Sequence, residues 1–400
     1  MSAVTCPMCG AASPAGAQFC EACGADLPVS AATPAPLVDA GPDGATAGLT
    51  AGLTAGSPAA DGPPLADPTA GSAPDPAAAA ESPLDVGWTG VIPGKVSIYE
   101  QPVAPGCRQC GAGNFVDGYC DHCGAKEPNP RDHLEESPAD WVAGVCDRGQ
   151  RHTRNEDGMS LSADPQPGTR ATLVVCDGVS HTTDSDVASL AAARAARAVL
   201  DRPLGTGIGV RESMVAAATQ RLGEAAAAAN AAVVATSTIT GDPTPPSCTF
   251  AAALITGRTA IVGNVGDSRS YWLPDGTSGA EQLSRDDSFA ADQIAAGIER
   301  KVAETGPMAH SITRWFGTDA PHDLTPHTRA LDLTGAGWLM VCSDGLWNYC
   351  SEAADLQELV GRFVAQGHTS AAALAGALVG FANEAGGVDN ITVALARVEA

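Results

Sequence analysis

Short apolar runs separated by turn-forming and polar residues recur over residues 141–398, a pattern typical of β-strands. The runs expected to form strands are residues 141–146, 171–176, 248–255, 259–266, 338–342 and 390–398. Apolar residues at helical spacing predict helices over about 184–200, 211–236, 352–364 and 369–384. Because several strand runs are adjacent hairpins and do not alternate regularly with helices, the pattern predicts antiparallel sheets covered by helices.

The N-terminal part of the chain has a different composition and divides into two cysteine modules and a linker. Residues 1–27 and 87–130 each contain two Cys-x2-Cys pairs, whereas residues 28–86 are almost wholly Ala, Pro, Gly, Thr, Ser and Asp. Such a linker cannot bury enough apolar surface to offset its ordering entropy, so we expect a disordered tether. One continuous domain is expected over residues 138–400.

The cysteine pairs have the spacing of zinc ligands. Two thiolates three positions apart can hold one tetrahedral ion from a tight turn, and the glycine after each pair lets backbone amides approach the sulfur. We therefore expect two structural Zn²⁺ sites in small ribbons that have no chemistry of their own. The expected ligands are Cys6, Cys9, Cys20 and Cys23 in the first ribbon, and Cys107, Cys110, Cys120 and Cys123 in the second.

The charge and the remaining cysteines limit the partners and the compartment. A formal net charge of −24 argues against a nucleic-acid partner, which would require clustered Lys and Arg. The N-terminus has neither a basic start nor an apolar segment, and five scattered cysteines are typical of reduced, buried thiols. We expect a cytoplasmic protein that binds neither nucleic acid nor membrane.

Four aspartates lie where a predicted strand meets a loop. Asp177 follows the apolar run of "LVVCDG", and Asp344 follows that of "LMVCSDG". Asp157 and Asp389 each come just before a strand. A rigid sheet can aim such short side chains at one point, and clustered carboxylates without a nearby lysine need a cation as counter-charge. Oxygen ligands favour Mg²⁺ or Mn²⁺ over Zn²⁺, and two ions sharing a carboxylate can activate water for hydrolysis.

Each acid taken alone also has a structural explanation. Asp-Gly is a common hairpin-turn dipeptide, "NED" can begin a helix, and "VDN" can form an Asx turn. The order and surroundings of the acids favour the metal interpretation. Seven blocks occur in register: "DRGQRHTRNEDG", "LVVCDGV", "CTFAAALITGRTAIVGNVGDSRSYWL", "LSRDDS", "HSITRWFG", "LMVCSDGLW" and "GGVDNITVAL".

These blocks make the chain resemble the metal-dependent protein serine/threonine phosphatases (type 2C, or PPM) of bacterial type. The resemblance runs over nearly all of residues 140–398 and implies an α+β fold. In that fold two antiparallel sheets flanked by helix pairs form a four-layer α-β-β-α sandwich, here preceded by the two zinc ribbons and the linker. It also implies hydrolysis of phosphoserine and phosphothreonine by water activated by two Mn²⁺ or Mg²⁺ ions.

The resemblance further implies a role for each acid. Asp177 would bridge the two ions, and the carbonyl of Gly178 would bind the first. Asp157 would face the first ion, with Glu156 fixing its water, while Asp344 and Asp389 would hold the second. Asp267 would be either a ligand of a weaker third ion or a turn acid paired with Arg269. Asn390 would support the ligands, and Asp286 would be structural. Residues 288–310 would form the flap beside the cleft.

Two departures from the family pattern concern substrate binding. The family has an arginine five residues before the "NED" aspartate, where it holds the substrate phosphate, but this chain has His152. Either a neighbouring arginine, Arg151 or Arg154, replaces it, or phosphate binding is weaker, since histidine lacks the bidentate fork. The second departure is "GVSHTTD" after Asp177, where His181 would either protonate the leaving group or remain solvated.

Two functions of different classes follow from these observations. The first is a phosphatase acting on phosphorylated proteins, including components of Ser/Thr kinase signalling, most simply as a monomer. The alternative is a catalytically weak, phosphatase-like regulator that binds phosphoproteins without turnover, for which the histidine at position 152 is the only support. All four metal aspartates are intact, which favours the enzyme.

Overall fold

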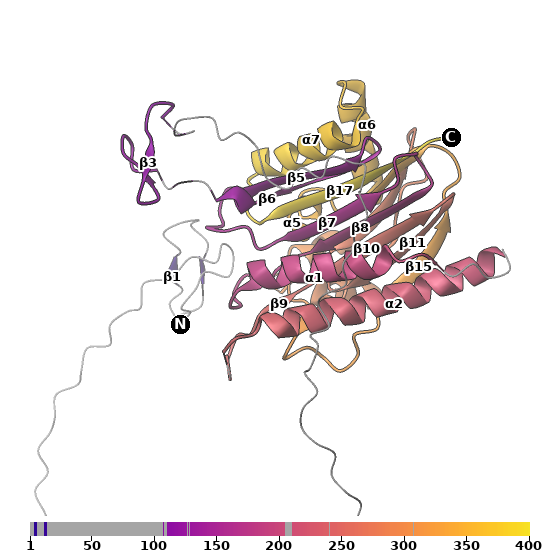
Figure 1. The fold of residues 1–400 in the computed structure, drawn as a ribbon, viewed down its shortest axis with the longest axis horizontal. Helices are drawn as coiled ribbons and strands as arrows, with labels where there is room; N and C mark the ends of the chain where they lie inside the picture. Colours follow the sequence, from indigo (N-terminus) through magenta and orange to yellow (C-terminus); the bar gives the residue numbers. More distant parts are fainter. Residues whose placement is uncertain are drawn as a thin grey trace, which may run out of the picture. The chain divides into compact units, whose positions relative to one another are not determined.

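Figure 1 shows the computed structural model of the chain, which describes residues 4–5, 12–13, 107, 110–125, 127, 129–204, 210–239, 241–306 and 308–400. The expected linker (28–86) and the cysteines of the first ribbon lie outside these residues. Of the first ribbon the structure describes one short antiparallel pair, β1 (Val4–Thr5) with β2 (Ala12–Ser13). Among the described helices none combines the length and apolar character needed to cross a membrane.

Two antiparallel sheets form the centre of the large domain. The five-stranded sheet has the order β15 (His327–Asp332), β11 (Thr259–Val265), β10 (Phe250–Thr256), β8 (Arg170–Cys176) and β7 (Gly158–Ala163). The six-stranded sheet has the order β13 (Glu281–Gln282), β12 (Arg269–Pro274), β16 (Gly337–Cys342), β17 (Ile391–Val398), β6 (Val142–Asp147) and β5 (His133–Ala139). A short pair, β9 (Ser247–Cys248) with β14 (Phe316–Gly317), lies outside both sheets.

Helix pairs cover the outer faces of the two sheets (Figure 1). Helices α1 (Ser185–Leu200) and α2 (Arg211–Thr236) pack on the five-stranded sheet, and α6 (Ala353–Ala365) and α7 (Ala371–Glu384) pack on the six-stranded one. Alternation along β8 explains the layering, because Leu173 and Val175 face the other sheet while Val174 and Cys176 face the helices. The expected four-layer α-β-β-α sandwich is confirmed.

The domain begins earlier than the expected residue 138, because β5 starts at His133 after a short 3₁₀ turn, Pro130–Asp132. This strand is polar and contains Pro138, which lies at an irregularity in its pairing with β6. Proline removes a ladder hydrogen bond and is tolerated at sheet edges and bulges, and β5 is an edge strand. The same explanation applies to β15, another polar edge strand that the apolar pattern does not reveal.

The second cysteine module is a small β-ribbon of its own, with β3 (Phe115–Val116) paired to β4 (Tyr119–Cys120). Each Cys-x2-Cys pair closes a turn in which the following glycine donates its amide to the first cysteine's carbonyl, Gly111 to Cys107 at 2.7 Å and Gly124 to Cys120 at 2.9 Å. Both glycines have positive φ, 71° and 73°. Glycine adopts this conformation without a steric penalty, so the glycine after each pair suits the turn.

Candidate metal centre

The antiparallel registers bring the predicted acids to one end of the sandwich. Gly158 of β7 pairs with Cys176 of β8, so Asp157, before β7, and Asp177, after β8, leave the five-stranded sheet together. In the other sheet Cys342 of β16 pairs with both Val393 of β17 and Arg269 of β12. Three acids therefore lie at the same end of the strands of that sheet, close in sequence to these pairs: Asp344, Asp389 and Asp267. Asp344 begins α5 (Asp344–Trp347), Asp389 precedes β17, and Asp267 precedes β12.

The two sheets meet at Asp157, which is fully buried. Its Oδ2 accepts hydrogen bonds from the Ser343 hydroxyl at 2.8 Å and the Thr392 hydroxyl at 2.6 Å, both from the opposite sheet. The Ser343 hydroxyl also accepts from the Thr392 backbone amide at 2.9 Å. Both hydroxyls therefore fix one carboxylate oxygen and leave the other, Oδ1, free to point elsewhere.

The acids lie close enough to repel one another. Burial, opposed by the Thr392 and Ser343 hydroxyls and reinforced by Asp389, raises the pKa of Asp157 to about 6. Burial, followed by a neighbouring carboxylate, likewise raises the pKa of Asp344 and of Asp389 to about 6. For Asp177, burial and then the charges of the other acids raise the pKa well above its usual range. A cluster in this state needs positive charge.

The donor set fits hard divalent cations. Asp157 Oδ1 and Asp344 Oδ1 are buried and have no hydrogen-bond partner among the described residues. A buried, unpaired carboxylate oxygen is costly unless a cation occupies the position it faces. Within the described residues no three of these acids bring their oxygens within 4.8 Å of one another, whereas the four ribbon cysteines do bring their sulfurs that close. Acids spaced in this way suit Mg²⁺ or Mn²⁺, which keep several waters in their coordination spheres.

Glycine is required at position 178 for a different reason from turn formation. A Cβ there would lie 2.5 Å from the backbone oxygen of Glu156 and 3.0 Å from Ser185 Cβ. The backbone of Gly178 also forms a bridge with Cys248. This close approach packs the segment after Asp177 against the segment that carries Glu156 and Asp157.

Asn390 braces the loop that carries the acidic pair. Its side-chain oxygen accepts the backbone amide of Glu156 at 2.8 Å, and its amide group donates to the carbonyls of Arg148 at 2.8 Å and Arg154 at 3.1 Å. Asn390 is buried, so these three bonds are protected from water. Asn390 thus holds the loop of Glu156 and Asp157 against the start of β17 and supports these acids through hydrogen bonds.

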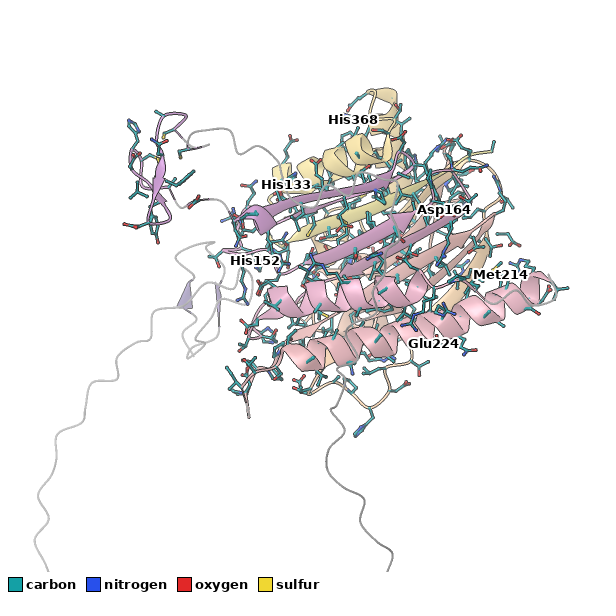
Figure 2. The ribbon with its side chains drawn as sticks, viewed as in Figure 1. His133, His152, Asp164, Met214, Glu224 and His368 are labelled. Atoms are coloured by element: carbon teal, nitrogen blue, oxygen red, sulfur yellow. The ribbon has the colours of Figure 1, made fainter. Side chains whose placement is uncertain are left out.

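His152 contacts the acid cluster directly. Its Nε2 lies 3.2 Å from Asp389 Oδ1, and its Nδ1 lies 3.4 Å from Glu156 Oε2. Figure 2 labels His152 at the end of the sandwich where α1 begins. The hydrogen bond that His152 donates to Glu156 and the charge of Asp389 raise the pKa of His152 despite its partial burial.

Arg154 contacts the acidic pair, whereas His181 is exposed to solvent. The guanidinium of Arg154 donates to Glu156 Oε1 at 2.7 Å and to the Ser185 hydroxyl at 3.1 Å, so it orients the acid. Burial would raise the pKa of Glu156, but donors from His152, Ser185 and Arg154 lower it overall. His181 lies exposed in the turn between β8 and α1, and among the described residues its ring makes no ion pair or hydrogen bond with the acids.

Asp267 is buried. Its burial is the larger cause, and the charge of Asp344 the next, that raises its pKa well above the usual range. Within the described residues Arg269 pairs with Asp286 and Glu304, both at 2.7 Å, so the alternative in which Asp267 pairs with Arg269 is not what the structure shows. The same ion pair gives Asp286 the structural role expected for it.

Residues that sequence reasoning missed are Ser343, Thr392 and His310. The first two hold Asp157, and His310, from the flap, lies 3.7 Å from Asp344 Oδ2 and stacks on Trp347. Ser343 and Thr392 are one and three residues from predicted acids, a proximity that could have marked them. His310 begins the block "HSITRWFG" at the end of the expected flap, and this position could have marked it as well.

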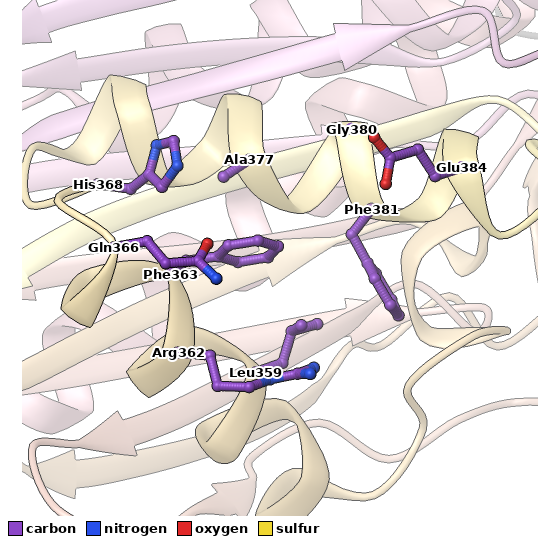
Figure 3. Close-up of a pocket in the computed structure, with 9 residues that line it drawn as sticks. All are labelled: Leu359, Arg362, Phe363, Gln366, His368, Ala377, Gly380, Phe381 and Glu384. Carbon is purple, nitrogen blue, oxygen red and sulfur yellow. The ribbon is translucent and has the colours of Figure 1, made fainter.

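Figure 3 shows a groove between α6 and α7. Its volume is about 390 Å³, and its lining includes Phe363, Phe381, His368 and Arg362. None of the clustered aspartates lines it. The groove is therefore a feature of the α6–α7 helix pair and not of the acid cluster.

Comparison with known sequences decides the family. Residues 148–379, more than half of the chain, match the family model described as protein phosphatase 2C. The chain belongs to the protein phosphatase 2C family. Membership confirms the predicted enzyme class, a metal-dependent protein serine/threonine phosphatase, and the range matched includes Asp157, Asp177 and Asp344.

The protein phosphatase 2C chain is also similar to named bacterial relatives. It is 27% identical to the serine/threonine phosphatase stp of Listeria welshimeri over 252 residues, which are 62% of this chain and 92% of that protein. It is 28% identical to the serine/threonine protein phosphatase PstP of Mycobacterium tuberculosis over 258 residues, 64% of this chain and 44% of that protein.

Two solved structures have the same fold. The Mycobacterium tuberculosis serine/threonine phosphatase PstP/Ppp superimposes with a TM-score of 0.51 at 25% identity, covering 65% of this chain and 98% of that one. The S. agalactiae serine/threonine phosphatase gives a TM-score of 0.54 at 23% identity, covering 66% of this chain and 100% of that one. At this identity the second comparison supports the fold alone.

Proposed function

We propose that the acid cluster hydrolyses phosphoserine and phosphothreonine in proteins, with two Mn²⁺ or Mg²⁺ ions held by Asp157, Asp177, Asp344 and Asp389. The observation that carries the proposal is the pair of buried, unpartnered oxygens, Asp157 Oδ1 and Asp344 Oδ1, inside a group of mutually repelling acids. Divalent ions bound there would neutralise the acids and supply Lewis-acid activation of water. The carbonyl of Gly178 and the side chains of Glu156 and Asp267 would complete the set, with Asp267 serving a weaker third ion.

The chain's own residues position the reaction. Water attacks phosphorus, the P–O bond to the serine or threonine breaks, and the leaving oxygen takes a proton, which gives phosphate and a free hydroxyl. Thr392 and Ser343 hold the Asp157 carboxylate in one orientation, and Arg154 does the same for Glu156. His181 is the candidate that would supply the proton to the leaving oxygen.

Phosphate anchoring is where this chain departs from its family. The family arginine is replaced by His152, and most donors of Arg154 are already occupied by Glu156, Ser185 and the carbonyl of Thr182. A single imidazole donor facing Glu156 and Asp389 would hold phosphate less tightly than a bidentate guanidinium. Weak substrate affinity is therefore expected, and this departure is what favours the regulator that binds without turnover.

One experiment separates the two functions. A phosphopeptide is incubated with Mn²⁺ and the full chain, and phosphate release is compared for the parent, Asp177→Asn and His152→Arg. Turnover by the parent and its loss in Asp177→Asn support the enzyme. An inert parent together with a fast His152→Arg variant would instead establish the binding regulator.

The second ribbon supports a Zn²⁺ site separate from the acid cluster. The sulfurs of Cys107, Cys110, Cys120 and Cys123 all lie within 4.8 Å of one another, with pairs at 3.6 and 3.7 Å. The backbone amide of Ala112 is the main cause that lowers the pKa of Cys110 to about 6, whereas burial and the neighbouring sulfurs raise the pKa of Cys123. Thiols this close would need a cation such as zinc to become thiolates together. The repeated spacing extends the proposal to Cys6, Cys9, Cys20 and Cys23. Elemental analysis tests it: Cys107→Ser with Cys110→Ser should lose about half of the bound zinc while keeping hydrolysis of a small aryl phosphate.

The cellular setting follows from the same chemistry. Cys146, Cys176, Cys248 and Cys342 are buried free thiols, which a reducing compartment keeps reduced. The presence of these buried free thiols supports a cytoplasmic location. Relatives named serine/threonine phosphatases support phosphorylated proteins as substrates. Components of Ser/Thr kinase signalling would be substrates of this class.

A further inference from the structure

Arg269 is a buried cation that the proposed chemistry does not use. It begins β12, and its side chain is only 2% exposed. Its guanidinium donates to Asp286 at 2.7 and 2.9 Å, to Glu304 at 2.7 Å, and to the hydroxyls of Ser351 and Tyr271 at 3.0 and 3.2 Å. A buried guanidinium with this many partners has a fixed position.

One of these partners belongs to the flap. Glu304 ends α4 (Arg300–Glu304), and its Oε1 accepts from Arg269 at 2.7 Å and from Arg300 at 2.9 Å. Its Oε2 accepts from the Ser351 hydroxyl at 2.6 Å. Burial would raise the pKa of Glu304, but the Ser351 and Arg269 donors lower it, so the carboxylate is charged at neutral pH. Glu304 thus joins the flap to the core through charged hydrogen bonds.

Apolar packing contributes little to holding the flap. Its own apolar cluster consists of Ala290, Ala303 and Ala309, with Ile294 packed against them. Large apolar side chains of the flap are exposed instead: Phe289, Ile298, Val302 and Met308. A cavity of about 340 Å³ is lined by residues of α3 (Phe289–Ala295) and α4 and by Arg269 and Trp347. A segment with so little apolar burial depends on its polar attachments.

Arg269 also contacts Trp347, which connects it to the acid cluster. Its guanidinium carbon lies 3.7 Å from the centre of the Trp347 ring, and the Trp347 indole N–H donates to the carbonyl of Asp267 at 3.0 Å. Trp347 ends α5, the short helix that Asp344 begins. The flap residue His310 stacks on the same indole and lies 3.7 Å from Asp344. Packed contacts therefore run from Glu304 to the edge of the acid cluster.

We propose that Glu304 is a positioning residue that latches the flap to the core through Arg269, and that this latch sets how tightly a phosphorylated protein is held over the acid cluster. The second half of the inference rests on the proposed phosphatase function. A protein substrate must pass the flap to reach the acids that His310 adjoins, whereas a small aryl phosphate needs no contact with it. The latch should therefore affect the two substrates differently.

The latch itself is tested without catalysis, by hydrogen exchange of the flap amides in the full chain with a chelator present. The variants are Glu304→Ala, Glu304→Gln and a matched control, Glu352→Ala. Glu352 pairs with Arg300 at 3.1 Å but is exposed and does not contact Arg269. Loss of charged, buried hydrogen bonds should speed exchange over residues 300–306 about tenfold in Glu304→Ala and less in Glu304→Gln, which keeps an acceptor. The control should change exchange less than about threefold.

The positioning role is tested by kinetics on the same variants. For Glu304→Ala the KM for a phosphoprotein should rise about tenfold with little change in kcat, while hydrolysis of p-nitrophenyl phosphate stays within about twofold of the parent. Unchanged exchange in Glu304→Ala would overturn the latch, and an equal loss on both substrates would overturn the positioning role. If the parent hydrolyses neither substrate, the proposed function fails, and the exchange result still decides the latch.

Discussion

Replacing Thr392 with valine removes one hydroxyl from the point where the two sheets meet. Thr392 is fully buried in β17, and its hydroxyl lies 2.6 Å from Asp157 Oδ2. Valine has nearly the same shape, so the change removes a hydrogen bond to a carboxylate without opening a cavity. Asp157 keeps only the Ser343 hydroxyl as a side-chain donor from the opposite sheet.

The magnitude follows from two opposing contributions. A hydrogen bond to a charged group contributes about 1.5–3 kcal/mol to the free energy of unfolding. The buried methyl group that replaces the hydroxyl returns roughly 0.8 kcal/mol. We therefore expect Thr392→Val to lower the free energy of unfolding by about 1–2 kcal/mol at pH 7.5 in a chelator, which is a drop of roughly 2–8 °C in Tm.

A second threonine provides a matched control. Thr172, in β8, is also fully buried, but its hydroxyl has no hydrogen-bond partner among the described residues. Thr172→Val should leave stability unchanged or raise it by up to about 1 kcal/mol, because it removes an unsatisfied polar group. Denaturant unfolding followed by tryptophan fluorescence measures both variants. Equal effects of the two substitutions, or no effect of Thr392→Val, would refute the claim that the hydroxyl holds Asp157.

Two further predictions use other parts of the domain. Gly178→Ala should lower the free energy of unfolding by about 1–3 kcal/mol, because its Cβ would lie 2.5 Å from the backbone oxygen of Glu156. The control is Gly223→Ala, where a Cβ meets nothing within 4 Å, and it should not destabilise the domain in the same denaturation assay. The hydrogen bond that the His133 ring donates to Asp147 raises the pKa of His133. This pair therefore stabilises the fold below the ordinary histidine pKa and loses that contribution as the pH rises through the raised value. Thermal melts should accordingly show His133→Gln less stable than the parent by about 0.5 kcal/mol at pH 5.5 and equal to it at pH 9, and a gap that grows with pH would contradict the assignment.

The helices and central strands could be predicted because each pattern is produced locally. The expected helix 211–236 is α2 itself, and the run 171–176 is β8 but for one residue. Both bury a continuous apolar stripe or face, which alternation along the chain reveals. The edge strands β5 and β15 lack that stripe, since one side of each strand has no neighbour and tolerates polar residues and proline.

The sequence by itself determined the candidate acids, the cysteine spacing and the layered fold, because strand ends, short-range spacing and apolar periodicity are properties of neighbouring residues. Only the tertiary structure decided that Ser343 and Thr392 hold Asp157, that Asn390 braces the loop of Glu156, and that Glu304 reaches Arg269. These contacts join residues 35 to 235 positions apart. Their partners are chosen by sheet register and by the closing of one sheet on the other, which no local pattern specifies.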